Sequence, residues 1–552
     1  MSPVQRTDAI LVGWERQENL GLRHILSYLE REGYRVRLVP YAPGAEESVV
    51  RAVCEEEPRL LGFSIIFQYN LRDYGQLMKT LRRAGVRSHF TAGGHYPSLR
   101  PENTLHEIPE LDSVVRFEGE LTSRELLERL EKPETWGEIQ GLSFRRDGGV
   151  IVNPARPLIE DLDRLPWPAR GEHLQTARGI PMAPILASRG CLFDCSFCSI
   201  RQFYGQAPGP LRRTRSPEDV AREMRHLCEA RGVRLFLFQD DDFAAKTENQ
   251  RDWVDRFLLA LDREGLSGRI GWKISCRVDD IEPEIMTRCR DRGLLTVYLG
   301  VESGSASGLK TLNKHATVEQ NLRAMEILKE TGVDADMGFM LLDPGSTLES
   351  VRENVVFLRK VADFGGPPVC FVKTLPLAGT AIEKQLAEEG RLTGDPLRPD
   401  YRYLDPRLDY YALWITLRFS HRNSAPNGLV ETLRIAHFDQ LVARAFEPAP
   451  WTEAYAAEIR HLIDRANESA ISTLERTLEI VEACPDAERV ALAWRHLNKI
   501  GEKDVAVQAS VFRGLGRILE RYSPTLCTAL RKSYPIPALN AHKLRAGSDL
   551  AV

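Results

Sequence analysis

Three cysteines, Cys191, Cys195 and Cys198, stand within eight residues, and their spacing is the strongest indication of chemistry in the chain. A loop with this spacing can turn three thiolates toward one soft metal centre. Iron–sulfur clusters and structural zinc sites usually take four ligands. No second C-x-x-C exists, and no cysteine or histidine follows closely as a fourth ligand. A [4Fe–4S] cluster held by three cysteines keeps one iron open to a small molecule.

Two other interpretations of the three cysteines compete with a cluster. They are buried thiols that never meet a metal, as free cysteines often are, or they form a redox-active or disulfide pair.

The pattern C-x3-C-x-aromatic-C resembles the signature of the radical S-adenosylmethionine (SAM) enzymes, with Phe197 at the aromatic position. The resemblance implies that Cys191, Cys195 and Cys198 hold a [4Fe–4S] cluster. It also implies that the open iron binds the amino and carboxylate groups of SAM and that Phe197 packs beside the adenine.

The composition is that of an ordinary globular protein of several domains. The chain has 552 residues, of which 43% are hydrophobic and 28% charged. The net charge of −4 and the lack of a basic domain predict no nucleic-acid partner. The other cysteines are isolated, which is typical of reduced residues in a cytoplasmic protein. No apolar run of about 18 residues and no signal segment is found, so no membrane partner is predicted.

Residues 1–132 alternate short apolar runs with helical patterns, which predicts a parallel, flavodoxin-like (Rossmann-type) sheet. Ligands bind such sheets at the carboxyl ends of the strands. Three of those ends carry small or polar residues, at Gln17–Asn19, at Ser64 with Gln68, and at Gly93-Gly94-His95. Paired glycines let a backbone approach a bulky ligand closely.

This unit resembles the cobalamin-binding domain that is fused to many radical SAM enzymes, on Gly93–Pro97 and Arg116–Glu120. The loop after the first strand lacks the histidine that binds cobalt in the best-known cobalamin domains, and His24 is expected to pack or to lie at the surface. The alternative is a flavodoxin-like domain that binds another ligand or only supports its neighbour. The cobalamin contacts that the resemblance implies are Gln17, Asn19, Ser64, Gln68, Gly93, Gly94, His95 and Glu118.

Residues 133–180 are predicted to form a connector. Residues 142–152 read as a hairpin that turns at Asp147-Gly148. The prolines of residues 161–168 favour an extended, stiff linker between two domains.

Residues 181–385 contain six strand–helix repeats, which predict a partial (β/α)6 barrel with its chemistry at the strand ends. Residues 241–243 and 300–304 resemble the cobalamin-type radical SAM pattern. Acidic residues 240–242 are candidates to pair the SAM ammonium, Arg277 its carboxylate, and Glu302 and Ser303 its ribose. Each of these is otherwise a solvated strand-end group. The SAM contacts proposed on this basis are Phe197, Asp241, Arg277, Glu302 and Ser303.

Cys370, on the sixth strand, is a candidate donor of a hydrogen atom or proton, with core packing as the competing interpretation. Residues 386–552 are predicted to be mainly helical, with an apolar stripe between positions 459 and 481. They carry no recognisable catalytic motif. By resemblance they cap the barrel and meet the substrate, with Tyr401, Tyr410 and Arg418 as candidate contacts.

The resemblance implies a cobalamin-dependent radical SAM methyltransferase. In such enzymes a 5′-deoxyadenosyl radical removes a hydrogen atom from a carbon of a small molecule or peptide, and methylcobalamin supplies the methyl group. Three alternatives stay open: a rearrangement, ring contraction or cyclisation without methyl transfer; methylation of an aromatic carbon without hydrogen abstraction; and a non-catalytic iron–sulfur electron-transfer protein. The expected partner is an external electron donor such as flavodoxin or ferredoxin, and the expected state is a monomer.

Overall fold

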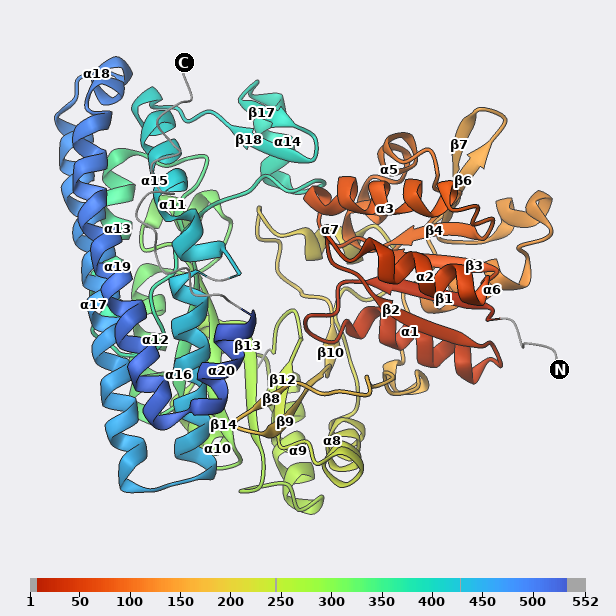
Figure 1. Ribbon diagram of the computed structural model, residues 1–552, viewed down its shortest axis with the longest axis horizontal. Helices are drawn as coiled ribbons and strands as arrows, with labels where there is room; N and C mark the ends of the chain where they lie inside the picture. Colours follow the sequence, from red (N-terminus) through yellow and green to blue (C-terminus); the bar gives the residue numbers. More distant parts are fainter. Residues whose placement is uncertain (1–6, 244–245, 427, 534–552) are drawn as a thin grey trace.

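The computed structural model describes residues 7–243, 246–426 and 428–533. Three parts follow one another along the longest axis of the molecule: an α/β unit, a curled central sheet and a layer of long helices (Figure 1). The predicted first and last domains extend to positions 1 and 552, so residues 1–6 and 534–552 of these domains lie outside the described residues.

The first part is a seven-stranded sheet in the order β2-β1-β3-β4-β5-β6-β7. Its first five strands are parallel, and the central ones are buried apolar runs with helices on both faces. This confirms the predicted flavodoxin-like sheet. The strands are β1 (Ala9–Gly13), β2 (Val36–Pro40), β3 (Leu60–Ser64), β4 (His89–Gly93) and β5 (Ser113–Val115). The helices are α1 (Leu20–Arg31), α2 (Glu46–Glu56), α3 (Leu71–Arg83), α4 (His95–Leu99), α5 (Pro101–Glu107) and α6 (Glu120–Glu128).

The predicted hairpin is β6 (Leu142–Arg146) and β7 (Gly149–Val152), and it belongs to this sheet rather than to the connector. Strand β6 pairs antiparallel with β5. The pairing satisfies the backbone groups that β5 would otherwise leave open at the sheet edge. The stiff segment before the barrel therefore begins after residue 152.

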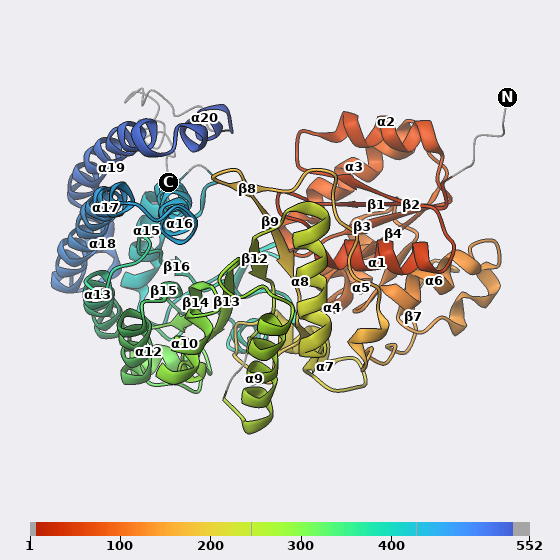
Figure 2. The ribbon, with the colours of Figure 1, turned by 90° about the horizontal axis from the view of Figure 1, so that it is seen from below.

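The central sheet has the order β16-β15-β14-β13-β12-β9-β8 and curls into a half-barrel (Figure 2). Six of its strands are parallel, and the short β8 pairs antiparallel with β9. This confirms the predicted partial barrel. The strands are β8 (Thr176–Ala177), β9 (Ile180–Ile185), β12 (Leu235–Phe238), β13 (Gly271–Arg277), β14 (Leu294–Glu302), β15 (Asp334–Leu342) and β16 (Val372–Lys373). The helices that cover it are α8 (Pro217–Arg231), α9 (Glu248–Arg263), α10 (Pro283–Arg290), α11 (Ala306–Thr311), α12 (Val318–Thr331) and α13 (Leu348–Ala362).

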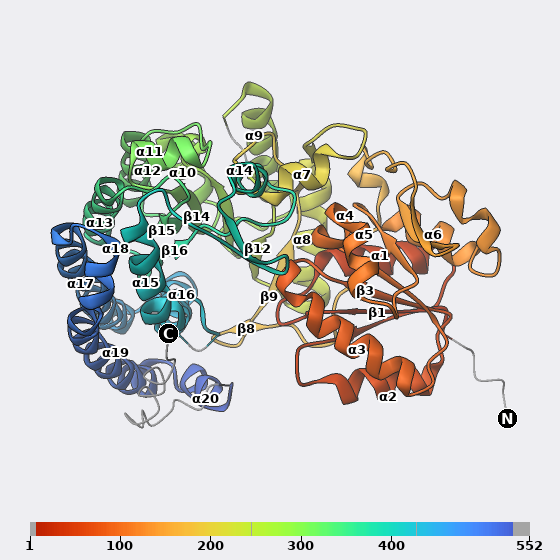
Figure 3. The ribbon, with the colours of Figure 1, turned by 90° about the horizontal axis from the view of Figure 1, so that it is seen from above.

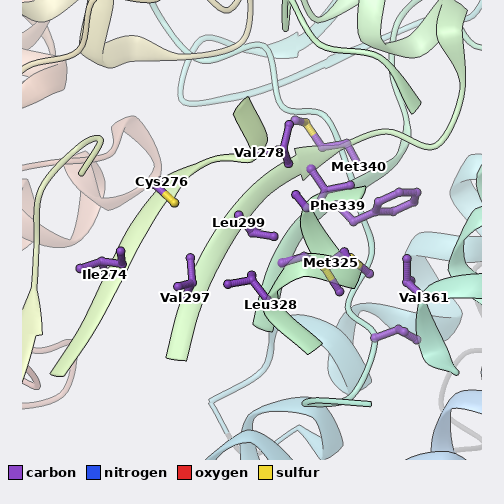
Figure 4. Packing of buried hydrophobic residues seen from close by; sticks show 14 of the residues in the cluster. Ile274, Cys276, Val278, Val297, Leu299, Met325, Leu328, Phe339, Met340 and Val361 are labelled. Carbon is purple, nitrogen blue, oxygen red and sulfur yellow. The ribbon is translucent and has the colours of Figure 1, made fainter. Parts of the chain in front are cut away.

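Alternate strand residues of the half-barrel point outward and form its core with the helices. Ile274, Val297 and Leu299 are buried against Met325 and Leu328 of α12 (Figure 4). Burying such side chains stabilises the fold by about 1.5–3 kcal/mol each. Since residues two apart share a face of a strand, the residues between them point into the barrel and are free for ligands.

The C-terminal part is helical apart from one hairpin, as predicted. Helices α17 and α19 lie along its outer side (Figure 3), and α16 packs inside them against the open side of the half-barrel. No helix of the described residues is long and apolar enough to cross a membrane. The elements are α14 (Ala381–Glu388), β17 (Leu392–Asp395), β18 (Arg398–Tyr401), α15 (Pro406–Ser424), α16 (Leu429–Phe446), α17 (Pro450–Ala483), α18 (Ala487–Leu492), α19 (Trp494–Tyr522) and α20 (Pro524–Ser533).

Candidate functional site

The three cysteines lie on a loop between β10 (Ser188–Arg189) and α7 (Ser199–Gly205). Gly190 begins the loop with a φ of +84°, and a Cβ there would lie 1.9 Å from the carbonyl oxygen of Leu211. Only glycine fits this turn. Ser196 anchors the far side of the loop, because its N–H donates to Leu312 O at 3.0 Å and its hydroxyl to Thr311 O at 2.8 Å.

The surroundings of the cysteines fit a cluster. All three are half-buried, and burial raises the thiol pKa of Cys191 to about 12 and of Cys198 to about 11. The backbone of Phe193 hydrogen-bonds to Cys191 and that of Ile200 to Cys198, which favours the thiolate that a metal requires. Among the described residues, no three His, Cys, Asp or Glu converge on one metal ion. The cysteines of a [4Fe–4S] cluster do not need to, since each binds its own iron.

Arg277, at the end of β13, lies beside the cluster loop. Its Nη1 is 3.8 Å from Cys195 Sγ, and its guanidinium lies 3.6 Å from the centroid of the Phe193 ring. Its other nitrogens donate to Asp279 at 2.8 Å and to Lys314 O at 2.6 Å. The positive charge therefore stabilises thiolate at Cys195, and most of the hydrogen bonds that a SAM carboxylate would need from Arg277 are made within the protein.

Strand β12 ends in three aspartates that hold the loop in place. Asp240 accepts hydrogen bonds from Ala187 N at 3.1 Å and from the Ser188 hydroxyl. Asp241 accepts from Gly190 N at 2.9 Å, and Asp242 Oδ2 lies 4.0 Å from Cys191 Sγ. Burial raises the pKa of Asp241 to about 6 and of Asp242 to about 7. Asp240 and Asp241 also line cavities that are described below, Asp240 the larger one and Asp241 the smaller one.

Glu302, at the end of β14, has a φ of +65°, which is uncommon for a residue with a side chain. The register of β14 with β15 shifts between Gly300 and Glu302. The carboxylate pairs with Lys314 Nζ at 3.1 Å, and a Cβ on Gly300 would lie 2.5 Å from that nitrogen. Non-glycine residues in this backbone region cluster at functional sites, which favours Glu302 as a ligand contact.

Three other predicted residues have contacts inside the protein. Ser303 is fully buried and donates to Asn354 Oδ1 at 2.9 Å, so its hydroxyl is used inside the protein. Phe197 is half-buried and packs against the barrel core. The Cys370 thiol lies 3.6 Å from Asn423 O, and the residue lines neither of the two cavities described below.

The predicted cobalamin residues surround a cavity of about 440 Å³, here called the slot. One wall is the carboxyl edge of the first sheet with α1 and α6, and the other is formed by Leu186–Arg189, Phe203 and Tyr204 of the barrel domain. A Cβ on Gly94, whose φ is +108°, would lie 2.4 Å from Ile65 O, so glycine is needed there. The predicted residues that line the slot are Gln17, Asn19, Ser64, Gly93, Gly94, His95 and Glu118.

Gln68 does not line the slot. Its amide donates to Pro396 O at 2.9 Å and accepts from Ala378 N at 2.7 Å. Both groups come from the segment that follows the barrel, so Gln68 ties the first domain to that segment.

Histidines occupy two places on the slot. His95 lies 3.1 Å from the Ser199 hydroxyl and stacks on Phe203 at 4.4 Å, and burial lowers its pKa to about 4, so it is neutral. His24 is 5% exposed, which excludes a surface position. Burial lowers the pKa of His24 well below its ordinary value.

Buried ion pairs fasten the slot to the cluster loop. Arg189, next to Gly190, pairs with Glu118 at 2.9 Å and with Glu120 at 2.7 Å, and Arg213 pairs with Glu118 at 2.9 Å. Burial opposes the charge of Glu118, but the two arginines outweigh it and lower its pKa. The cobalamin-type domain and the cluster loop therefore share one electrostatic network.

We expect Glu120→Gln to lower the free energy of unfolding by about 3 kcal/mol, because it leaves part of the Arg189 charge uncompensated in a buried site. Urea titration followed by circular dichroism measures this. The matched control is Glu229→Gln, whose exposed pair with Arg225 predicts a change below about 1 kcal/mol. Equal losses in the two variants would contradict the importance of the network.

A second cavity of about 570 Å³, here called the chamber, occupies the half-barrel. Strands β13 to β15 contribute inward side chains and α16 closes the open side. The chamber and the slot share Gln17 and Gln239, so the two cavities adjoin. The polar side chains that sequence reasoning missed here are Lys273, Ser275, Thr296, Asp334, Asp336, Arg434 and His437.

The C-terminal candidates do not reach the chamber. The Tyr401 hydroxyl lies 3.3 Å from that of Tyr403, both buried; Tyr410 is 40% exposed; and Arg418 pairs with Asp504 at 3.2 Å. Helix α16 contributes side chains to the chamber wall, and the three predicted residues do not.

Comparison with known proteins gives the family. The B12 binding domain model matches residues 15–127 and the Radical SAM superfamily model matches residues 185–358. An uncharacterized methyltransferase of Pyrococcus horikoshii is 30% identical over 350 residues, which cover 62% of this chain and 73% of that protein. The chain belongs to the cobalamin-dependent radical SAM enzymes. Its cofactors are accordingly a [4Fe–4S] cluster, SAM and cobalamin.

The names of other proteins that this chain resembles indicate more than one kind of reaction. The anaerobic magnesium-protoporphyrin IX monomethyl ester cyclase of Rubrivivax gelatinosus is 30% identical over 277 residues, or 48% of each chain. The structure of the enzyme OxsB with aqua-cobalamin and S-adenosylmethionine bound has a TM-score of 0.67 at 18% identity, covering 95% of this chain and 84% of that one. The likeness to OxsB shows a shared fold over nearly the whole chain.

Proposed function

We propose that this enzyme transfers a methyl group to a carbon of a small-molecule substrate held in the chamber. The observation that carries the proposal is the contact between the two cavities, because the slot predicted for cobalamin opens beside the chamber inside the half-barrel. When bound, the cluster with SAM supplies hydrogen-atom abstraction and cobalamin supplies the methyl group.

The chain's own residues position these reactants. Cys191, Cys195 and Cys198 hold the cluster, with the charge of Arg277 beside them, and Glu302 with Lys314 is the candidate polar contact for SAM. Helix α16 covers the open side of the barrel, and its side chains form part of the chamber wall. Holding one C–H bond in a fixed place is what gives such a reaction its selectivity.

The name of the Pyrococcus horikoshii relative supports methyl transfer. Cyclisation without methyl transfer is the second candidate, because a relative of equal identity is a cyclase. An external donor such as flavodoxin or ferredoxin, and a monomeric state, stay predictions. We expect turnover to require added flavodoxin. We also expect sedimentation to give a single species of 62.4 kDa.

A half-reaction that needs no substrate tests the proposal. Protein loaded with cobalamin is reduced anaerobically and mixed with SAM that carries a deuterated methyl group. We expect trideuteromethyl-cobalamin and S-adenosylhomocysteine in equal amounts, measured by absorbance and mass spectrometry. Formation of 5′-deoxyadenosine without any methylcobalamin would contradict methyl transfer and favour the cyclase chemistry.

A further inference from the structure

Lys273 lies in the middle of β13 with its side chain in the chamber. Strand register places it beside Leu237 on one side and Thr296 on the other, and Thr296 lies beside Asp334. Its sequence neighbours Trp272 and Ile274 are buried in the outward-facing core. Lys273 therefore belongs to an inner layer of the barrel and has no route to the outer surface of the sheet.

The acidic groups around Lys273 are engaged with other partners. Asp334 accepts from His437 Nε2 at 2.8 Å and from Thr296 Oγ1 at 3.2 Å. Asp336 pairs with Arg434 at 2.8 Å. Two further carboxylates on the chamber wall are held in the same way, Asp439 by Arg178 at 2.9 Å and Asp240 by Ala187 N at 3.1 Å.

Lys273 itself has no hydrogen bond or ion pair within the part of the chain that the structure describes. Its Nζ lies 5.6 Å from the centroid of the Tyr298 ring. An ammonium group that is removed from water without a partner is unfavourable. Burial lowers the pKa of Lys273 and the charge of Arg434 adds to this, while the carboxylates of Asp336 and Asp334 oppose it only in part. A group that supplies negative charge in the chamber would remove the penalty.

We propose that Lys273 binds an oxyanion, a carboxylate or a phosphate, of the substrate. The inference deepens the proposed function, since it rests on the chamber being the substrate site. The rest of the wall suits an apolar body, because it includes Met182, Leu237, Phe238, Ile435 and Leu441. A cavity of about 570 Å³ is of the size that holds a small organic ligand.

The position of Lys273 also sets the direction of the substrate. Lys273 precedes Arg277 by four residues on the same face of β13, which is about 13 Å at about 3.3 Å per residue. Arg277 lies beside Cys195, at the end of the strand. A substrate anchored through its oxyanion at Lys273 extends toward the cluster loop and the slot, so the carbon that reacts lies at the end remote from the oxyanion.

Equilibrium binding tests the inference without turnover. Octyl phosphate, octanoate and neutral octanol are titrated by calorimetry into the enzyme loaded with its cofactors. We expect one or both anions to bind at least about tenfold more tightly than octanol, because a hydrogen bond to a charged group contributes about 1.5–3 kcal/mol. Preference for octyl phosphate identifies a phosphate, and preference for octanoate a carboxylate. Equal binding of all three probes would overturn the inference.

Variants locate the interaction. Lys273→Met should weaken anion binding at least about tenfold. Lys273→Arg should retain most of the binding. The control Lys310→Met removes an exposed lysine of α11 and should leave anion binding unchanged. Unaltered anion binding by Lys273→Met would overturn the inference. If the Lys273→Met variant does not fold, reductive methylation of lysines in the unmodified protein replaces it. Octyl phosphate or octanoate should protect Lys273 from methylation but should not protect Lys310. No protection at Lys273 would refute the assignment.

The outcomes separate this inference from the proposed function. Anion binding that depends on Lys273 in an enzyme that never forms methylcobalamin would refute methyl transfer alone. Methylcobalamin formation without anion binding would refute the role of Lys273 alone.

Discussion

Cys198→Ala will abolish the iron–sulfur cluster and, with it, the reductive cleavage of SAM. Two thiolates cannot hold a [4Fe–4S] cube that already lacks a fourth protein ligand. After anaerobic reconstitution we expect iron to fall from about four atoms per chain to near zero. The formation of 5′-deoxyadenosine should fall at least about 1,000-fold, equivalent to about 4 kcal/mol in the barrier. Iron and sulfide assays and liquid chromatography of the nucleoside measure both.

The matched control is Cys54→Ala, which removes an exposed cysteine of α2 in the other domain. It should keep its iron and its activity. A Cys198→Ala protein that retained a full cluster would show that the three-cysteine loop is not the ligand set. That result would favour a non-catalytic iron–sulfur electron-transfer protein instead.

Ser64→Trp will block the slot and remove cobalamin while the cluster stays intact. Ser64 ends β3, lines the slot and lies 3.4 Å from the Asn19 amide. A Cβ on Gly13 would lie 3.3 Å from the Ser64 Cβ, so β1 and β3 approach closely there, and we expect the much larger indole to enter the slot. We expect the affinity for hydroxocobalamin to fall at least about 100-fold, or about 2.7 kcal/mol.

Absorbance of the corrin after gel filtration measures the loss, and the iron content of the same sample reports the cluster. The control Ser48→Trp places the same indole on the exposed side of α2. Unchanged cobalamin binding by Ser64→Trp would mean that the corrin binds elsewhere. Loss of iron together with cobalamin would instead indicate that the substitution disrupts the whole protein.

Much of the fold follows from local patterns in the sequence. Short apolar runs separated by helical stripes predict both parallel sheets, and the structure confirms them. The turn residues predict the hairpin, but they do not show which strand the hairpin pairs with. Whether it pairs with β5 or stands alone depends on the unpaired edge of a strand about thirty residues earlier.

In the candidate site, too, local features can be predicted from the sequence and features that depend on distant contacts cannot. The cysteines and the glycine turns depend on local sequence, and the structure places the three cysteines on one loop. Gln68 and Ser303 stand next to ligand-lining positions in the sequence, yet their polar groups are used by Ala378, Pro396 and Asn354, which are distant in the chain. Sequence position near a strand end does not show whether a polar group is already satisfied.

A pattern in the sequence does indicate the chamber. Polar residues occupy every second position in three neighbouring strands, at 273 and 275, at 296 and 298, and at 334 and 336. This period places them on one face of each strand, on the inner side of the half-barrel, where polar groups require partners. Helix α16 had no such signal, because its contact with the barrel depends on how the C-terminal helices fold back.

The central claim is that cobalamin in the slot and the cluster on its loop lie close together, since the ion pairs of Arg189 join the wall of the slot to that loop. Electron paramagnetic resonance of the protein loaded with cob(II)alamin tests it directly, before and after the cluster is reduced to its paramagnetic state. The account predicts that the cob(II)alamin signal broadens and relaxes faster on reduction, and that neither change occurs in Cys198→Ala. A cob(II)alamin signal that is identical in both states of the cluster would contradict it.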